Sequence, residues 1–244
     1  MIASLAMYDR PETAAANDRF WQAIRAALGS GPDGLSRDAD LWDIWQSPDL
    51  LLAQTCGLPY RARLHSHVTL VATPDYGLPG CPPGHYNSVL VAHRARLGAP
   101  LAAFDGASLA YNEALSQSGW AAPCAHFAAH GLSIGARLET GAHRASARAV
   151  AERRADLAAL DALTWDLIRR YDDFAADLVE IGRTAPSPAL PFITAGGRDP
   201  VALRGALRGA VDRMSAADRA LLGLRGIVEL PQSAYLAMPL PPAP

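Results

Sequence analysis

The sequence of 244 residues contains no lysine, because all 22 of its basic residues are arginines. A P-loop places a lysine beside the phosphates, and both a Schiff base with pyridoxal phosphate and a Ser-Lys dyad need a lysine amine. The absence excludes these three kinds of site. The formal net charge is −2, so we expect no nucleic acid partner, and any anion must be bound by a local arrangement.

Several other familiar signals are also missing. There is no Gly-x-Ser-x-Gly elbow, no Gly-x-Gly-x-x-Gly after the first expected strand, and no His-Glu-x-x-His. No apolar stretch is long enough to span a bilayer, so no membrane insertion is expected. The chain as written shows no secretory signal, which indicates the cytoplasm, whereas a signal removed ahead of Met1 would indicate the periplasm.

Metal and disulfide signals are weak. The three cysteines lack Cys-x-x-Cys spacing, although Cys56 and Cys81 could pair in an oxidising compartment. His65 and His67 would share one face of a strand, and His126 and His130 would share one face of a helix. Because no acidic or cysteine ligand lies near either pair in sequence, solvated or core histidines are favoured over a zinc site. We expect no metal and no cofactor.

Strand-like and helix-like segments alternate along the chain. Apolar runs predict strands over 2–7, 50–53, 68–72 and 88–92, and helical spacing predicts helices over 12–28 and 40–46. From residue 107 the alternation becomes regular: strands 107–111, 136–140, 156–160 and 178–182 flank helices 118–130, 143–153 and 162–170. The segment 192–194 would return the chain to the first lobe, and a helical region begins at 200–214.

This order predicts an α/β protein of two lobes, each a mostly parallel sheet flanked by helices and joined by crossing strands. Lobe 1 would comprise residues 1–90 and 192–244, and lobe 2 residues 91–191. Ligands of such folds bind at the carboxyl ends of strands, in the cleft between lobes. The candidate binding residues therefore follow strands. Those in the first lobe are Tyr8, Gln54, Thr55 and Tyr86.

A Ser-Gln-Ser-Gly turn opens the helix expected at 118–130. The first turn of a helix has backbone N–H groups without partners and the positive end of the helix dipole. Hydroxyls at Ser116 and Ser118, with Gln117 and Gly119 between and after them, would complete a phosphate-sized cradle there. The alternative is an ordinary N-cap, since serine commonly caps helices.

Two further residues begin predicted helices. His143 follows Thr140-Gly141-Ala142, and its ring could donate to an anion that also meets the helix N-terminus, or it could be a local cap or a solvent-facing ring. Asp161 follows an apolar strand and is either an N-cap or a carboxylate aimed at a cationic group of the ligand.

Four segments in this order resemble the phosphate, phosphite and phosphonate substrate-binding proteins of ABC transporters: 54–60, the 111–120 stretch with its Ser-Gln-Ser-Gly turn, 141–150 and 155–161. The resemblance implies the two-lobed type II periplasmic-binding-protein fold. It also implies that a phosphonate is held by Ser116, Gln117, Ser118, His143, Tyr8 and Tyr86, with Asp161 at the position that meets a ligand amine. Gln117 departs from the family's threonine-like residue, and its longer amide would change the pocket size.

The resemblance favours a protein without catalytic activity that captures a small anion of the phosphate, phosphite or phosphonate class, with an ABC permease as partner. One alternative is an enzyme of cofactor or quinone biosynthesis on the same fold, in which His143 or Asp161 acts as general base. Another is a ligand sensor whose closure signals to a second protein.

Overall fold

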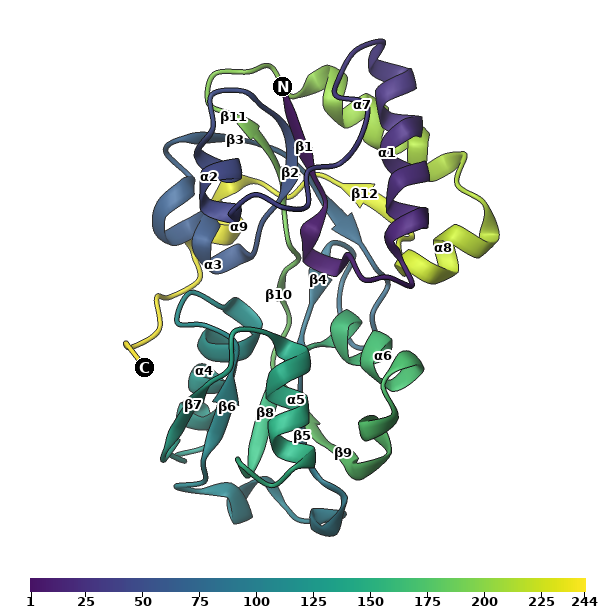
Figure 1. The fold of residues 1–244 in the computed structure, drawn as a ribbon. Helices are drawn as coiled ribbons and strands as arrows, with labels where there is room; N and C mark the ends of the chain where they lie inside the picture. The colour runs from purple at the N-terminus through teal and green to yellow at the C-terminus, as the bar shows by residue number, and fades with distance from the viewer. The chain divides into compact units, whose positions relative to one another are not determined.

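A computed structural model describes all residues from Met1 to Pro244 and separates them into two compact units (Figure 1). Unit 1 contains Met1–His85 and Pro188–Met238, and unit 2 contains Tyr86–Ser187 and Pro239–Pro244. The chain leaves unit 1 within strand β4 (His85–Tyr86) and returns within β10 (Ser187–Pro188), and these two strands pair with each other.

Unit 1 is built on a sheet with the strand order β1-β2-β11-β3-β12. β1 and β2 are parallel, whereas β11 runs antiparallel to β2 and β3, and β12 runs antiparallel to β3. The strands are β1 (Ile2–Ser4), β2 (Leu50–Gln54), β3 (Val68–Asp75), β11 (Phe192–Ala195) and β12 (Gly226–Val228). β1, β2 and β3 therefore run in one direction, and their carboxyl ends lie along one edge of the sheet.

Helices cover the sheet of unit 1. The helices are α1 (Ala14–Leu28), α2 (Leu41–Gln46), α3 (Gly57–Pro59), α7 (Val201–Asp212), α8 (Ala216–Leu222) and α9 (Gln232–Leu236), with helical turns η1 (Ala6–Tyr8) and η2 (Tyr60–Leu64). Figure 1 shows α1 and α7 side by side, in agreement with their packing contacts. α1 forms because Phe20, Trp21 and Ile24 recur at helical spacing and are buried, and it ends at Gly29, whose φ of 70° suits glycine.

Unit 2 is built on a second mixed sheet with the order β7-β6-β8-β5-β9. Its strands are β5 (Ser88–His93), β6 (Leu109–Tyr111), β7 (Arg137–Glu139), β8 (Leu157–Asp161) and β9 (Leu178–Arg183). β6 is parallel to β7 and β8, and β5 is antiparallel to β8 and β9. The carboxyl ends of β6, β7 and β8 therefore share one edge, which is where the expected anion-binding residues follow.

The helices of unit 2 are α4 (Ala122–Ala129), α5 (His143–Ala151) and α6 (Ala162–Tyr171), with shorter helical turns η3 (Arg94–Arg96), η4 (Leu101–Phe104), η5 (Gln117–Ala121) and η6 (Asp173–Asp177). Trp120 of η5 and Phe127 of α4 join a core with Leu90, Leu109 and Leu157 of the sheet. α5 packs against β5, β6 and β8. These contacts hold η5, α4 and α5 against the sheet of unit 2.

Most predicted elements are present, with differences at their ends. The helix expected from Ser118 begins as a wide π-type turn, η5, and becomes α-helical only at Ala122. The strand expected over 2–7 stops at Ser4, and a helical turn follows. Both sheets are mixed, because the strands that return the chain, β11 and β12 in unit 1 and β5 in unit 2, run against their neighbours.

The histidine and cysteine expectations have mixed outcomes. His65 and His67 do not share a strand face, because the helical turn after Pro59 continues to Leu64 and β3 begins only at Val68. The His126 and His130 rings do lie together, with centroids 4.5 Å apart. Cys56 and Cys81 are not joined in a disulfide. No group of three or more potential metal-ligating side chains is present, and no helix has the length and hydropathy needed to cross a membrane.

Candidate functional site

The Ser-Gln-Ser-Gly turn of unit 2 lies at the carboxyl end of β6. The Ser116 hydroxyl accepts a hydrogen bond from the Gly119 N–H at 2.9 Å, and the Ser116 carbonyl accepts from the N–H groups of Trp120 at 3.2 Å and Ala121 at 3.0 Å. Ser116 therefore caps the helical turn, which is the ordinary role that the sequence left open. Its role as an anion ligand stays a prediction.

Ser118 is the residue of this turn that meets His143. Its Oγ lies 2.9 Å from Nε2 of His143, and its carbonyl accepts a hydrogen bond from the Ser88 hydroxyl at 2.9 Å. The turn is thus tied to β5 on one side and to the start of α5 on the other. Ser118 and His143, which the sequence analysis treats as separate candidates, are therefore in direct contact in the structure.

The imidazole of His143 is electrically neutral at physiological pH. Burial lowers its pKa from 6.5 to about 4, and an interaction with the backbone of Ala159 opposes this shift only in part. The residue as a whole keeps some surface, but its Nδ1 atom is buried, so the ring itself loses hydration. A bound anion would meet a neutral hydrogen-bonding pair, Ser118 and His143, in place of a cation.

The start of α5 adds backbone donors beside this pair. The cap residue Ala142 has no polar side chain, and Ser146 is the first residue whose N–H bonds back into the turn, to the carbonyl of Ala142. The preceding N–H groups, from His143 to Ala145, have no partner within the helix. Together with the helix dipole, they suit an oxyanion held next to His143.

Asp161 has a defined structural role. It is 2% exposed, and its carboxylate accepts hydrogen bonds from the N–H groups of Leu163 at 2.9 Å and Thr164 at 3.1 Å. Asp161 therefore caps α6, the more common of the two alternatives that the sequence allowed. Recognition of a ligand amine by this residue stays a prediction.

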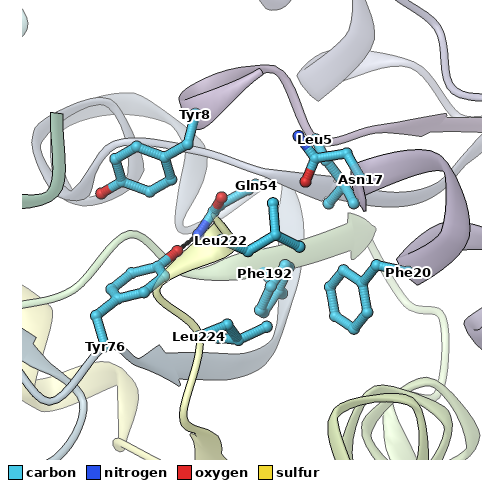
Figure 2. A pocket seen from close by; sticks show the side chains of 9 residues that line it. All are labelled: Leu5, Tyr8, Asn17, Phe20, Gln54, Tyr76, Phe192, Leu222 and Leu224. Atoms are coloured by element: carbon cyan, nitrogen blue, oxygen red, sulfur yellow. Dashed lines mark hydrogen bonds between the residues drawn. The ribbon is translucent and has the colours of Figure 1, made fainter. Parts of the chain in front are cut away.

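Two of the expected residues, Tyr8 and Gln54, line a small pocket at the carboxyl edge of the unit 1 sheet (Figure 2). Gln54 donates hydrogen bonds from Nε2 to Tyr76 Oη at 2.9 Å and to the Leu190 carbonyl at 3.0 Å, and the rings of Tyr8 and Tyr76 meet edge to face at 5.4 Å. The pocket is lined by Leu5, Tyr8, Asn17, Phe20, Gln54, Tyr76, Phe192, Leu222 and Leu224, none of which carries a charge.

The remaining expected residues are buried. Thr55 is fully buried beside Gln54, and Tyr86 of β4, assigned to unit 2, is 1% exposed. The structure thus brings Tyr8 and Gln54 together in unit 1, and Ser116, Gln117, Ser118, Gly119 and His143 together in unit 2. Thr55 does not line the unit 1 pocket.

One side chain at these sites, Tyr76, was not predicted. It follows the end of β3 and lies beside a proline- and glycine-rich segment that gave no strand signal. A polar residue directly after a strand is the signal that could have identified it, since the same signal identified Gln54. Asn112 begins the polar segment 112–118 that the sequence places after a strand, although it was not named as a ligand, and its Oδ1 atom is buried without a hydrogen-bond partner.

Solved structures of other proteins share the fold of this chain. The fold is similar to that of PhnD1 from Prochlorococcus marinus in complex with methylphosphonate, with a TM-score of 0.74 at 14% identity, covering 96% of this chain and 94% of that chain. It is also similar to a binding-protein component of an ABC phosphonate transporter from Pseudomonas aeruginosa, with a TM-score of 0.72 at 16% identity, covering 97% and 83%. A Xanthomonas citri protein bound to ATP gives a TM-score of 0.64 at 17% identity, covering 96% and 92%. The protein therefore has the α/β, two-lobed type II periplasmic-binding-protein fold.

The family follows from the sequence match. Residues 49–235 match the family described as ABC transporter, phosphonate, periplasmic substrate-binding protein. The chain belongs to this family, whose members are binding proteins of transporters. No curated protein matches the chain.

Proposed function

We propose that the protein binds a small phosphorus oxyanion, of the phosphate, phosphite or phosphonate class, at the Ser118 and His143 pair of unit 2. The observation that carries the proposal is the 2.9 Å contact between Ser118 Oγ and His143 Nε2, with the partnerless N–H groups of α5 directly beside it. These donors are uncharged, and the ligand supplies the charge. Membership of the phosphonate-binding family supports the same class of ligand.

The protein acts, in this proposal, as the solute-binding component of an ABC transporter in the periplasm, delivers its ligand to a permease and performs no chemistry. The state of His143 supports this over an enzyme on the same fold. A general base works best with a pKa near the operating pH, and burial lowers the pKa of His143 to about 4. Asp161, the other candidate base, is engaged in capping α6.

Thermal unfolding with a panel of compounds tests the proposal. The panel contains phosphate, phosphite, methylphosphonate, 2-aminoethylphosphonate, sulfate and biosynthetic carboxylates. A ligand at 100 times its Kd stabilises the folded state by about 2.7 kcal/mol. For a chain of this size that corresponds to a rise in Tm of roughly 5–10 °C. We expect at least one phosphorus oxyanion to give a rise of this order.

Matched variants locate the effect. Ser118→Ala and His143→Ala should reduce the rise in Tm, whereas Ser133→Ala and His130→Ala should keep it, because Ser133 bonds to Asp105 and His130 lies at the end of α4. A rise with a carboxylate or a heterocycle and none with any phosphorus oxyanion would overturn the proposal. Turnover of the stabilising compound would establish the enzyme instead.

A further inference from the structure

We infer that Asn112 is an additional ligand of the anion, and that its side-chain amide N–H donates a hydrogen bond to an oxygen of the bound oxyanion. The inference rests on the proposed function, because it adds a donor to the same site. Asn112 lies outside the Ser-Gln-Ser-Gly motif and takes no part in the contact between Ser118 and His143.

Asn112 lies between the two segments that form the site. Its backbone carbonyl accepts a hydrogen bond from the Gly141 N–H at 2.9 Å, in the loop that leads directly into His143. Its side chain lies against Gly119, the residue after Ser118. Asn112 therefore contacts both the turn that carries Ser118 and the loop that leads into His143. The side chains of Ser118 and His143 join the same turn and loop at 2.9 Å.

The contact with Gly119 orients the amide. A Cβ atom built on Gly119 would overlap Asn112 Oδ1, so the oxygen lies directly against the glycine backbone. There Oδ1 is buried and accepts no hydrogen bond. Because Oδ1 lies against Gly119, Nδ2 lies on the opposite side of the amide, and it makes no hydrogen bond to the protein.

Asn112 is half-buried, and the N–H groups of Nδ2 remain accessible to a ligand. An oxyanion bound next to Ser118 would accept a hydrogen bond from Nδ2, whereas Oδ1, itself an acceptor, stays against Gly119. The amide adds a donor without adding charge, in keeping with the neutral His143. Glycine at position 119 leaves space for the Asn112 amide, because a Cβ atom there would overlap Oδ1.

Calorimetric titration of phosphate and methylphosphonate into two Asn112 variants tests the inference. Asn112→Ala removes the donor, and a lost hydrogen bond to a charged ligand corresponds to roughly a tenfold or greater loss of affinity. Asn112→Asp keeps the shape but places a carboxylate against the anion, so its affinity at pH 8 should fall further. Ala125→Asp, which adds a carboxylate at an exposed position of α4, is the charge control and should bind as the wild type does.

The pH dependence separates ligand contact from a purely structural role. As the pH falls from 8 to 5, the bound oxyanion passes from a dianion to a monoanion, and a small fraction of the carboxylate introduced by Asn112→Asp is protonated, so the repulsion between them weakens. The ratio of the Kd of Asn112→Asp to that of the wild type should therefore shrink. A structural role would lower Tm in both variants without this trend in affinity.

The outcomes are distinct. If Asn112→Ala and Asn112→Asp bind with wild-type affinity while Ser118→Ala binds weakly, the inference is overturned and the proposed function stands. If the wild type binds neither phosphate, phosphite nor any phosphonate, the proposed function fails, and the inference fails with it.

Discussion

At the scale of single residues, the candidate site relies on hydrogen bonds from uncharged groups. Ser118 and His143 contact each other at 2.9 Å, and burial keeps His143 neutral near pH 7. In a partly buried site such hydrogen bonds to an anion are stronger than they are in water. The lack of lysine in the sequence is consistent with this solution, because neutral donors and helix N-termini need no ammonium group.

The depressed pKa of His143 predicts acid sensitivity. The pKa is lowered from 6.5 to about 4 on folding, so between these values the unfolded chain binds more protons than the folded chain. The stability conferred by this residue is complete above pH 6.5 and is lost as the pH falls toward 4. Urea unfolding at pH 7.5 and pH 5 should show that the wild type loses about 1–2 kcal/mol more than His143→Gln does. Equal losses would show that His143 titrates normally.

Gly119 predicts a steric effect at the same site. Gly119→Ala should lower the free energy of unfolding by about 1–3 kcal/mol, the usual cost of overpacking, because the new Cβ overlaps Asn112 Oδ1. Gly205→Ala is the matched control: this glycine lies inside α7 with nothing within 4 Å of a new Cβ. It should be neutral or stabilising by up to about 1 kcal/mol. Denaturant titration that finds Gly119→Ala as stable as the wild type would refute the close approach.

At the scale of secondary-structure elements, strand ends and helix starts were predictable because they depend on local sequence. α5 begins at His143 and α6 follows Asp161 as expected. The start of α6 carries a capping side chain, Asp161, whereas α5 has no side-chain cap and follows the Thr140-Gly141 break. The π-type turn η5 was not predicted, because it arises when the Ala121 N–H bonds to the Ser116 carbonyl under the constraint of the core around Trp120. The antiparallel direction of β11 and the existence of β12 were also missed, since pairing to β3 depends on contacts between segments far apart in sequence.

The cap of α6 provides a test at this scale. Asp161→Ala should lower the free energy of unfolding by about 1–2 kcal/mol, because the N–H groups of Leu163 and Thr164 lose their acceptor. Asp161→Asn should recover most of this loss, since asparagine caps as well as aspartate. If Asp161→Asn is as stable as the wild type but selectively loses affinity for 2-aminoethylphosphonate, Asp161 also contacts the ligand amine.

At the scale of the whole molecule, the two compact units each have their own mixed sheet and core, and the sequence match over residues 49–235 places the chain in the phosphonate-binding family. The resemblance carried by four short segments was sufficient to predict that fold and family. It was insufficient for the site, because Asn112 gains its place only from the close approach of Gly119, which the sequence motif does not reveal.

Calorimetric titration of methylphosphonate or phosphate, whichever raises Tm more, into the wild type, Ser118→Ala and Ser133→Ala tests the central claim most directly. We predict one site per chain in the wild type and in Ser133→Ala. Ser118→Ala should bind roughly tenfold or more weakly, as expected for the loss of one hydrogen bond to a charged ligand. Equal affinity in all three proteins, or no binding to the wild type, would contradict an anion site at Ser118 and His143.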